Sequence, residues 1–214
     1  HCFLTKRKQL VLINGARSQP SEVISGVPQG SVLGPLLFLI LLGDIDEGIT
    51  NAFLSSFADD TRILNQTNTP LEVANLQEDL DSVYKWTAEN NMQLNNGKFE
   101  HLHYGPPQND RQFKSSSDSI IEEKDCVKDL GVLMSNTGQF TQHIHKMINA
   151  AKQQCSWILR TFKTREPTLM LTLWKSLVQS RIEYCSQLWC PLKKGAIQDI
   201  EMVQRSFIRK ISGY

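Results

Sequence analysis

Apolar residues recur at helical spacing in four stretches, one in the middle of the chain and three near its end. The first stretch begins at Thr69-Pro70-Leu71-Glu72, a capping box with proline at the first helical position, and predicts a helix over residues 70–91. The stripes that predict the other three helices are Ile144, Ile148, Ala151, Cys155, Leu159 and Phe162; Leu169, Leu173 and Leu177; and Ile200, Val203, Phe207 and Ile211. The end of the chain is therefore predicted to be helical.

Residues 32–42 form an apolar run without a polar face. Ser31 before the run and Pro35 in its first turn are typical of a helix start, with the serine as the N-cap. Because this helix is apolar all round, we expect it to be buried. The run is too short to span a bilayer, and we expect no signal peptide before it.

Short strand-like runs separate the helices, and Asn14-Gly15 is a strong hairpin-turn signal between the first two. The runs lie at residues 9–13, 21–27, 52–57, 61–64, 92–94, 99–104 and 130–133. A polar loop rich in proline and serine is predicted over residues 105–118. Together these elements predict an α+β fold, with a mixed domain over residues 1–136 and a helical domain over residues 137–214.

The charge of the chain is unevenly distributed. The 214 residues have a net charge of +1, but residues 44–125 hold 16 acidic and 6 basic residues, whereas residues 151–214 hold 11 basic and 4 acidic residues. A basic, helical tail is typical of a protein that binds a polyanion, and a solvated amphipathic surface explains it equally well. The charge alone does not separate these alternatives.

The five cysteines are odd in number and scattered, which argues against a disulfide framework or a zinc site. We expect reduced thiols and an intracellular protein, cytoplasmic or nuclear, that is not secreted. The chain begins at His1 rather than methionine, so we also expect it to be a piece of a longer protein.

Candidate chemistry lies in two segments. Asp59 and Asp60 stand between two strand-like runs, and paired carboxylates at a hairpin tip suit a divalent metal that serves phosphoryl transfer. A solvated turn is the alternative for this pair. Upstream, Gly26 and Gly30 permit close approach of a ligand to the backbone, and Gln29 offers a donor and an acceptor before a helix N-terminus, where phosphates bind readily.

Both segments resemble conserved blocks of reverse transcriptases. Residues 26–31, Gly-Val-Pro-Gln-Gly-Ser, resemble motif B, and Phe57-Ala58-Asp59-Asp60 resembles the aromatic-x-Asp-Asp hairpin of motif C. Residues 94–98 are similar to the lysine-bearing motif D, and residues 127–132 to the strand that enters the thumb. The likeness covers essentially the whole chain and is strongest to jockey-type non-LTR retrotransposons, which are long interspersed elements.

The resemblance implies an RNA-directed DNA polymerase that uses Mg²⁺ or Mn²⁺, with an RNA template, a DNA primer and dNTPs as partners and no membrane. It implies a partial palm over residues 1–136, followed by a helical thumb and C-terminal extension. Asp59 and Asp60 would hold metal, and Phe57 is expected to pack beneath the hairpin. Lys98 would neutralise charge or protonate the leaving pyrophosphate, with an ordinary surface lysine as an equal alternative. The residues implied to bind nucleotide or template are Gly26, Pro28, Gln29, Gly30 and Ser31. The candidate phosphate contacts, with a solvated helix face as an equal alternative, are Lys193, Lys194, Arg205, Arg209 and Lys210.

One departure from the family pattern limits this reading. No acid before Gly26 fits motif A, since Glu22 is in the wrong context, and the fingers are absent as well. We therefore expect this chain alone to bind Mg²⁺ poorly and to polymerise little. The alternatives are a truncated, catalytically inactive remnant that is at most a basic nucleic-acid-binding module, and a generic metal-dependent phosphotransferase.

Overall fold

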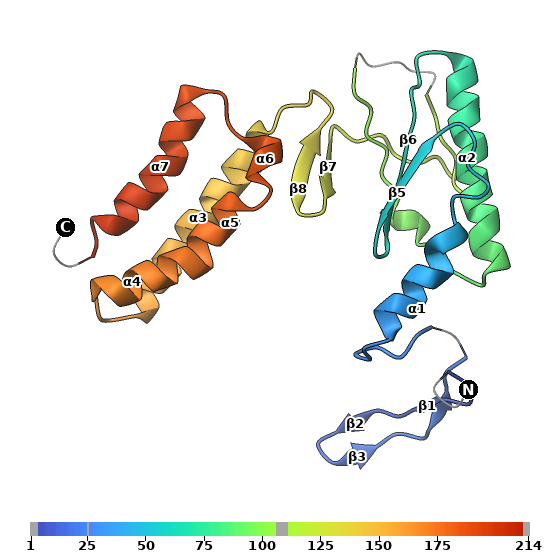
Figure 1. The fold of residues 1–214 in the computed structure, drawn as a ribbon, viewed down its shortest axis with the longest axis horizontal. Helices are drawn as coiled ribbons and strands as arrows, with labels where there is room; N and C mark the ends of the chain where they lie inside the picture. Colours follow the sequence, from blue (N-terminus) through green and yellow to red (C-terminus); the bar gives the residue numbers. More distant parts are fainter. Residues whose placement is uncertain (1–3, 25, 106–110, 212–214) are drawn as a thin grey trace. The chain divides into compact units, whose positions relative to one another are not determined.

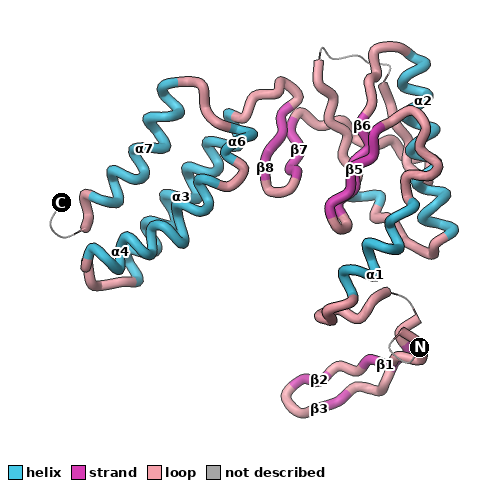
Figure 2. The backbone as a smooth tube through the Cα atoms, viewed as in Figure 1, coloured by secondary structure: helices cyan, strands magenta, loops and turns pink. Residues whose placement is uncertain are grey.

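The computed structural model describes residues 4–24, 26–105 and 111–211. The chain divides into two compact units, which are treated separately below: residues 1–97 with 109–120, and residues 98–108 with 121–214. Helices and small antiparallel sheets occur together, so the predicted α+β class is confirmed (Figures 1 and 2). Residues 121–136 group with the helical tail, and a boundary between folding domains at residue 136 stays a prediction.

The first unit opens with a long hairpin. Strand β1 (Lys8–Gln9) pairs with β4 (Ser21–Glu22), and β2 (Leu12–Ile13) pairs with β3 (Ala16–Arg17). The predicted turn lies at its end, where Asn14 and Gly15 both have positive φ, as a tight two-residue hairpin turn requires.

Helix α1 (Gly34–Leu41) continues into the 3₁₀ helix η1 (Leu42–Asp44). The expectation that this helix is buried is wrong, because Gly34 is its only buried residue and Ile40 is 66% exposed. A helix with apolar residues all round needs cover on every side. Here the first unit covers only one side of it, where Phe38 packs against the small core that Leu42 joins.

A second hairpin and a long helix build that core. Strands β5 (Phe53–Phe57) and β6 (Asp60–Leu64) pair antiparallel, and helix α2 (Pro70–Glu89) follows with its predicted capping box formed. Leu54 and Ile63 from the hairpin pack against the cluster that contains Val83 of α2. The hairpin is therefore docked on one face of α2.

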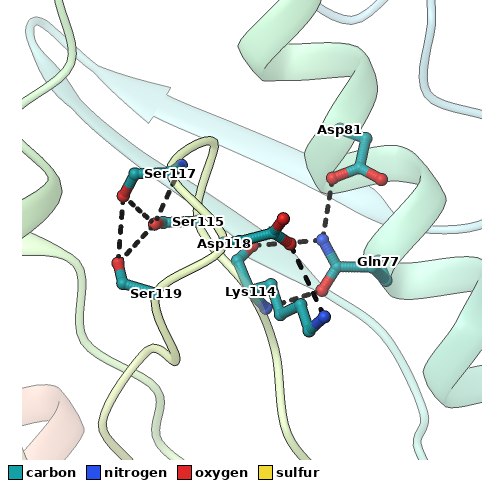
Figure 3. Close-up of polar contacts among 7 residues, drawn as sticks. All are labelled: Gln77, Asp81, Lys114, Ser115, Ser117, Asp118 and Ser119. Carbon is teal, nitrogen blue, oxygen red and sulfur yellow. Dashed lines mark hydrogen bonds and ion pairs between the residues drawn. The ribbon is translucent and has the colours of Figure 1, made fainter.

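Residues 111–120 pack against the same helix (Figure 3). The Gln77 side chain donates to the Lys114 carbonyl oxygen at 3.1 Å and accepts from the Lys114 N–H at 2.8 Å. Lys114 also forms an antiparallel bridge with Ile120. Phe113 is only 3% exposed, and the hydroxyls of Ser115 and Ser119 lie 2.6 Å apart. This part of the predicted polar loop is thus anchored on α2, while residues 106–110 lie outside the described residues.

The second unit holds a third hairpin and the predicted tail helices. The 3₁₀ helix η2 (Asn96–Lys98) contains the boundary between the units, since only Lys98 belongs to the second. The other elements of the second unit are β7 (Cys126–Asp129), β8 (Val132–Ser135), α3 (Thr141–Thr161), α4 (Pro167–Trp174), the π-helical turn η3 (Lys175–Gln179), α5 (Ser180–Glu183), α6 (Ser186–Trp189) and α7 (Lys194–Ile208). The core lies where α3, α4, η3 and α7 meet, and Ile158, Met170, Val178 and Phe207 are at most 1% exposed there. The first and third apolar stripes of the tail are confirmed. The second is offset by one residue, because Met170, Trp174 and Val178 are buried there, whereas Leu173 and Leu177 only pack at the edge of the core.

The strands predicted at residues 92–94 and 99–104 are wrong. The Met92 N–H donates to the Thr87 carbonyl and so prolongs the end of α2, and the Gly97 N–H donates to the Asn95 side chain within the turn that forms η2. Of the second run, only His101 forms a bridge, with Glu123. A strand-like sequence pattern that finds no partner strand of matching length forms a single bridge instead of a ladder. In the described part of the chain, no helix is both long enough and apolar enough to cross a membrane.

Candidate functional site

The Asp59-Asp60 pair lies at the tip of the β5–β6 hairpin. Phe57 pairs with Asp60, so Ala58 and Asp59 form a two-residue turn at the end of a ladder of five residue pairs. Ala58 has a φ of 54°, a conformation that costs a non-glycine residue about 1–2 kcal/mol. The tight turn therefore places both acids at the end of a regular hairpin.

Both carboxylates are exposed, and no hydrogen bond or ion pair ties either to another described residue. Behind them, the hydroxyls of Ser56 and Thr61 lie 3.0 Å apart across the two strands. The expectation that Phe57 packs beneath the hairpin is wrong, because its side chain is 64% exposed and only the base of the hairpin reaches the core. The tip thus exposes carboxylate oxygens, which are ligands that suit a hard divalent cation.

The glycine-rich turn has the backbone that its sequence predicts. Gly26 and Gly30 both have a φ of 78°, in the region that favours glycine. The Ser31 hydroxyl donates to the Pro28 carbonyl at 2.7 Å and accepts from the Gly34 N–H at 3.0 Å, which closes the turn onto the start of α1. A Cβ at Gly34 would lie 2.9 Å from that carbonyl oxygen, so this position has no room for a side chain.

Helix α1 begins later than predicted. Its N-cap is Leu33, without a side-chain cap, so the prediction of Ser31 as the N-cap is wrong in position, although Ser31 still accepts from the first helical N–H. Gln29 and Gly30 are exposed beside this helix start. No hydrogen bond or ion pair between described residues links this turn to the Asp59-Asp60 hairpin, and Ser25 lies outside the described residues.

Lys98 ends η2 and is exposed. It belongs to the second unit, whereas Asp59 and Asp60 belong to the first. The role of Lys98 beside the two acids stays a prediction.

The candidate phosphate contacts are exposed and lie at both ends of α7. Lys193 and Lys194 stand at its start, whereas Arg205, Arg209 and Lys210 stand in or just after its last turn. With a rise of about 1.5 Å per residue, the two groups are about 20 Å apart along the helix. Arg205 is paired with Glu201 at 2.6 Å, so it is the least available of the five for a phosphate.

A groove of about 360 Å³ lies between α3 and α7. Lys152 and Lys210 are among its lining residues, together with the largely buried Cys155 and Phe207. Burial raises the pKa of the Cys155 thiol to about 11, although the nearby Lys210 opposes the shift. The thiol is therefore protonated and inert at neutral pH.

A residue that the sequence analysis did not single out, Asp79 of α2, is only 1% exposed. Its carboxylate accepts from the backbone N–H groups of Thr50, Asn51 and Ala52, which directly precede β5. In the sequence, Asp79 lies three residues after Leu76 and so falls on the apolar side of α2, which is the only indication of its burial. The nearby acids Glu78 and Asp81 make it look like part of a solvated acidic segment.

The described residues contain no cluster of three or more histidine, cysteine, aspartate or glutamate side chains that would hold a metal ion. Asp59 and Asp60 supply two carboxylates of a site that needs further ligands. The metal role of the pair and the absence of a third acid both stay predictions.

Comparisons with known proteins agree on one family. The family model for reverse transcriptase (RNA-dependent DNA polymerase) matches residues 1–160. The chain is 26% and 25% identical to the RNA-directed DNA polymerases from mobile element jockey of Drosophila funebris and Drosophila melanogaster, and 24% identical to the probable RNA-directed DNA polymerase from transposon X-element of Drosophila melanogaster. Each alignment covers 99% of this chain but 24% of the relative, so the chain spans about a quarter of their length.

No solved structure matches the chain significantly. The family match covers three quarters of the chain and includes the glycine-rich turn, the Asp59-Asp60 hairpin and the lysine of η2. The chain belongs to the reverse transcriptase (RNA-dependent DNA polymerase) family.

Proposed function

We propose that this chain is part of a polymerase that copies RNA into DNA during retrotransposition, acting on an RNA template, a DNA primer and dNTPs. The observation that carries the proposal is the Asp59-Asp60 pair, exposed at the tip of a five-pair hairpin. The names of the Drosophila relatives support the same activity.

The chemistry of this family depends on a divalent metal ion. We assign that ion as Mg²⁺ or Mn²⁺, since carboxylate oxygens suit both cations, with Asp59 as the stronger ligand and Asp60 as a weaker or outer partner. A bound ion would act as a Lewis acid on the phosphoryl group being transferred. The missing third carboxylate would come from a motif A strand outside these residues.

The other roles follow from exposed positions. The turn at residues 26–31 presents backbone and the Gln29 amide to the nucleotide or template, and Lys98 neutralises charge on the leaving pyrophosphate. Residues 1–136 act as part of the palm, and residues 137–214 act as the thumb and its extension. Cations at the two ends of α7 contact phosphates.

The test is primer extension by a longer polymerase that contains these residues together with a motif A strand. Asp59→Asn removes a metal ligand that contributes several kcal/mol, so the rate should fall by about 1,000-fold. Asp46→Asn, at an exposed acid of the same unit, is the matched control and should retain full activity. Near-normal extension by Asp59→Asn would show that the metal role is wrong.

A second candidate function is a non-catalytic module that binds nucleic acid. It is favoured by the lack of a three-ligand cluster in the described residues and by the exposed cations of α7. The purified 214-residue chain would then bind RNA or DNA without extending a primer. The binding constant is measured by filter binding at several salt concentrations. Neutralising Lys193, Lys194, Arg209 and Lys210 should reduce the slope of log K against log salt concentration by about 0.7–0.9 per lost phosphate contact. An unchanged slope would show that these residues do not contact phosphates.

A further inference from the structure

We propose that Asp79 is a positioning residue that holds the Asp59-Asp60 hairpin in register on α2. This inference rests on the proposed function, in which the two acids at the hairpin tip hold a divalent ion. It concerns a residue outside the four motifs that define the family resemblance.

The contacts of Asp79 form a complete acceptor site. One carboxylate oxygen accepts from the Thr50 N–H at 3.0 Å, and the other accepts from the N–H groups of Asn51 at 3.0 Å and Ala52 at 2.6 Å. The Asn51 side-chain amide lies 3.4 Å from the first oxygen. An ionised carboxylate only accepts hydrogen bonds, so both of its oxygens can serve the three consecutive backbone N–H groups. The amide of an asparagine has one acceptor oxygen and a donor NH₂ group, so it cannot do the same.

The position of these donors links Asp79 to the acids at the tip. Ala52 is the residue before β5, and β5 pairs with β6 residue by residue from Phe53–Leu64 to Phe57–Asp60. A slip of one residue at the base would move every side chain of the strand to the other face of the hairpin. Fixing the base therefore fixes the face on which the tip presents its carboxylates.

A second anchor lies one helical turn further along α2. Val83, four residues after Asp79, packs in the cluster with Leu54 and Ile63 of the hairpin. That apolar contact is non-directional, and a slipped strand would still offer apolar side chains to it. The directional hydrogen bonds of Asp79 select one register, which the apolar contact cannot do alone.

The first measurement is amide hydrogen exchange on the 214-residue chain, resolved by NMR. In Asp79→Asn the new NH₂ group faces backbone donors, so we expect exchange at residues 50–57 and 60–64 to accelerate at least about tenfold. Glu78→Gln, at the exposed neighbouring acid, is the matched control and should leave exchange unchanged. Protection of α2 reports whether the first unit remains folded, and α3 in the other unit is the reference.

The second measurement is the broadening of the amide signals of residues 58–61 by Mn²⁺, which a purely structural role would not change in a folded chain. Asp79→Asn should need about tenfold more Mn²⁺ for the same broadening, because a displaced tip would bind the ion with a dissociation constant about tenfold higher. If exchange accelerates only at residues 50–52 and the Mn²⁺ response is unchanged, Asp79 is a local cap and the inference is overturned.

Two further variants keep the outcome decisive. If Asp79→Asn unfolds the first unit, Asp79→Glu replaces it, because it keeps the charge but displaces the carboxylate by one methylene. A weakened Mn²⁺ response with α2 still protected supports the inference, and a wild-type response overturns it. If Asp59→Asn broadens like the wild type, the proposed metal role fails, while the exchange pattern still decides whether Asp79 holds the hairpin.

Discussion

Replacing Gly34 with alanine tests the close packing of the glycine-rich turn against the start of α1. The added Cβ would lie 2.9 Å from both the Pro28 carbonyl oxygen and the Ser31 hydroxyl. The hydroxyl can rotate away, but it then loses its bonds to Pro28 and to the Gly34 N–H. The carbonyl belongs to the backbone, so the turn itself must shift.

The magnitude follows from these contacts. Two lost hydrogen bonds cost about 1 kcal/mol each, and the forced shift costs about 1 kcal/mol more. Replacing glycine by alanine returns at most about 1 kcal/mol of backbone entropy. The net loss is about 2 kcal/mol, which corresponds to a local opening constant about 30-fold larger.

Amide hydrogen exchange at Leu37 measures this opening, because its N–H donates to the Leu33 carbonyl at 2.9 Å in the first turn of α1. Gly43→Ala is the control, since a Cβ at that position meets no atom within 4 Å. In this variant, exchange of the Leu37 amide should be unchanged or slower. Equal protection of Leu37 in the wild type and Gly34→Ala would refute the argument that this glycine is required by space.

Three further predictions concern the hairpin tip, a buried thiol and a helix cap. Ala58→Gly should relieve the φ of 54° and stabilise the β5–β6 hairpin by about 1 kcal/mol, seen as slower amide exchange in both strands; no gain would contradict strain at the turn. The raised pKa of Cys155, about 11, should leave it unlabelled by a thiol reagent at pH 8 while the exposed Cys190 reacts, and comparable rates in the native chain would contradict its burial. Hydrogen bonds from the N–H groups of Leu169 and Thr168 lower the pKa of Glu166, so its stabilising effect is present above the unfolded pKa and lost as pH falls through the folded pKa. Denaturant unfolding of the wild type and Glu166→Gln should therefore differ above about pH 5 and converge in acid, and a pH-independent difference would refute this cause.

Elements with local signals were predictable from the sequence. The capping box at Thr69 and Glu72 gave the start of α2, and Asn14-Gly15 gave the tip of the first hairpin, because each depends on bonds made within a few residues. The pair Asp59-Asp60 was placed at a turn for the same reason, since two pairing strands flank it.

Burial and remote anchoring depend on partners that a local pattern does not contain. The apolar run that forms α1 predicts a helix correctly, but the first unit covers only the side that carries Phe38, so Leu36 and Leu39 are more than half exposed. Asp79 shows the converse case. Within α2 it resembles its solvated neighbours Glu78 and Asp81, yet it is buried because the donors at Thr50 to Ala52 lie almost thirty residues earlier in the chain.

The hairpin tip combines both kinds of determinant, and this explains how a strained, exposed turn can be held in one arrangement. The turn at Ala58 is local and costs about 1–2 kcal/mol, which the tip alone does not recover because the carboxylates of Asp59 and Asp60 bond to no other described residue. The compensation comes from the base, where three backbone donors meet one buried carboxylate and Leu54 enters the core. Stability at the base therefore permits two like charges to remain adjacent and open at the tip, where the proposed metal role needs them.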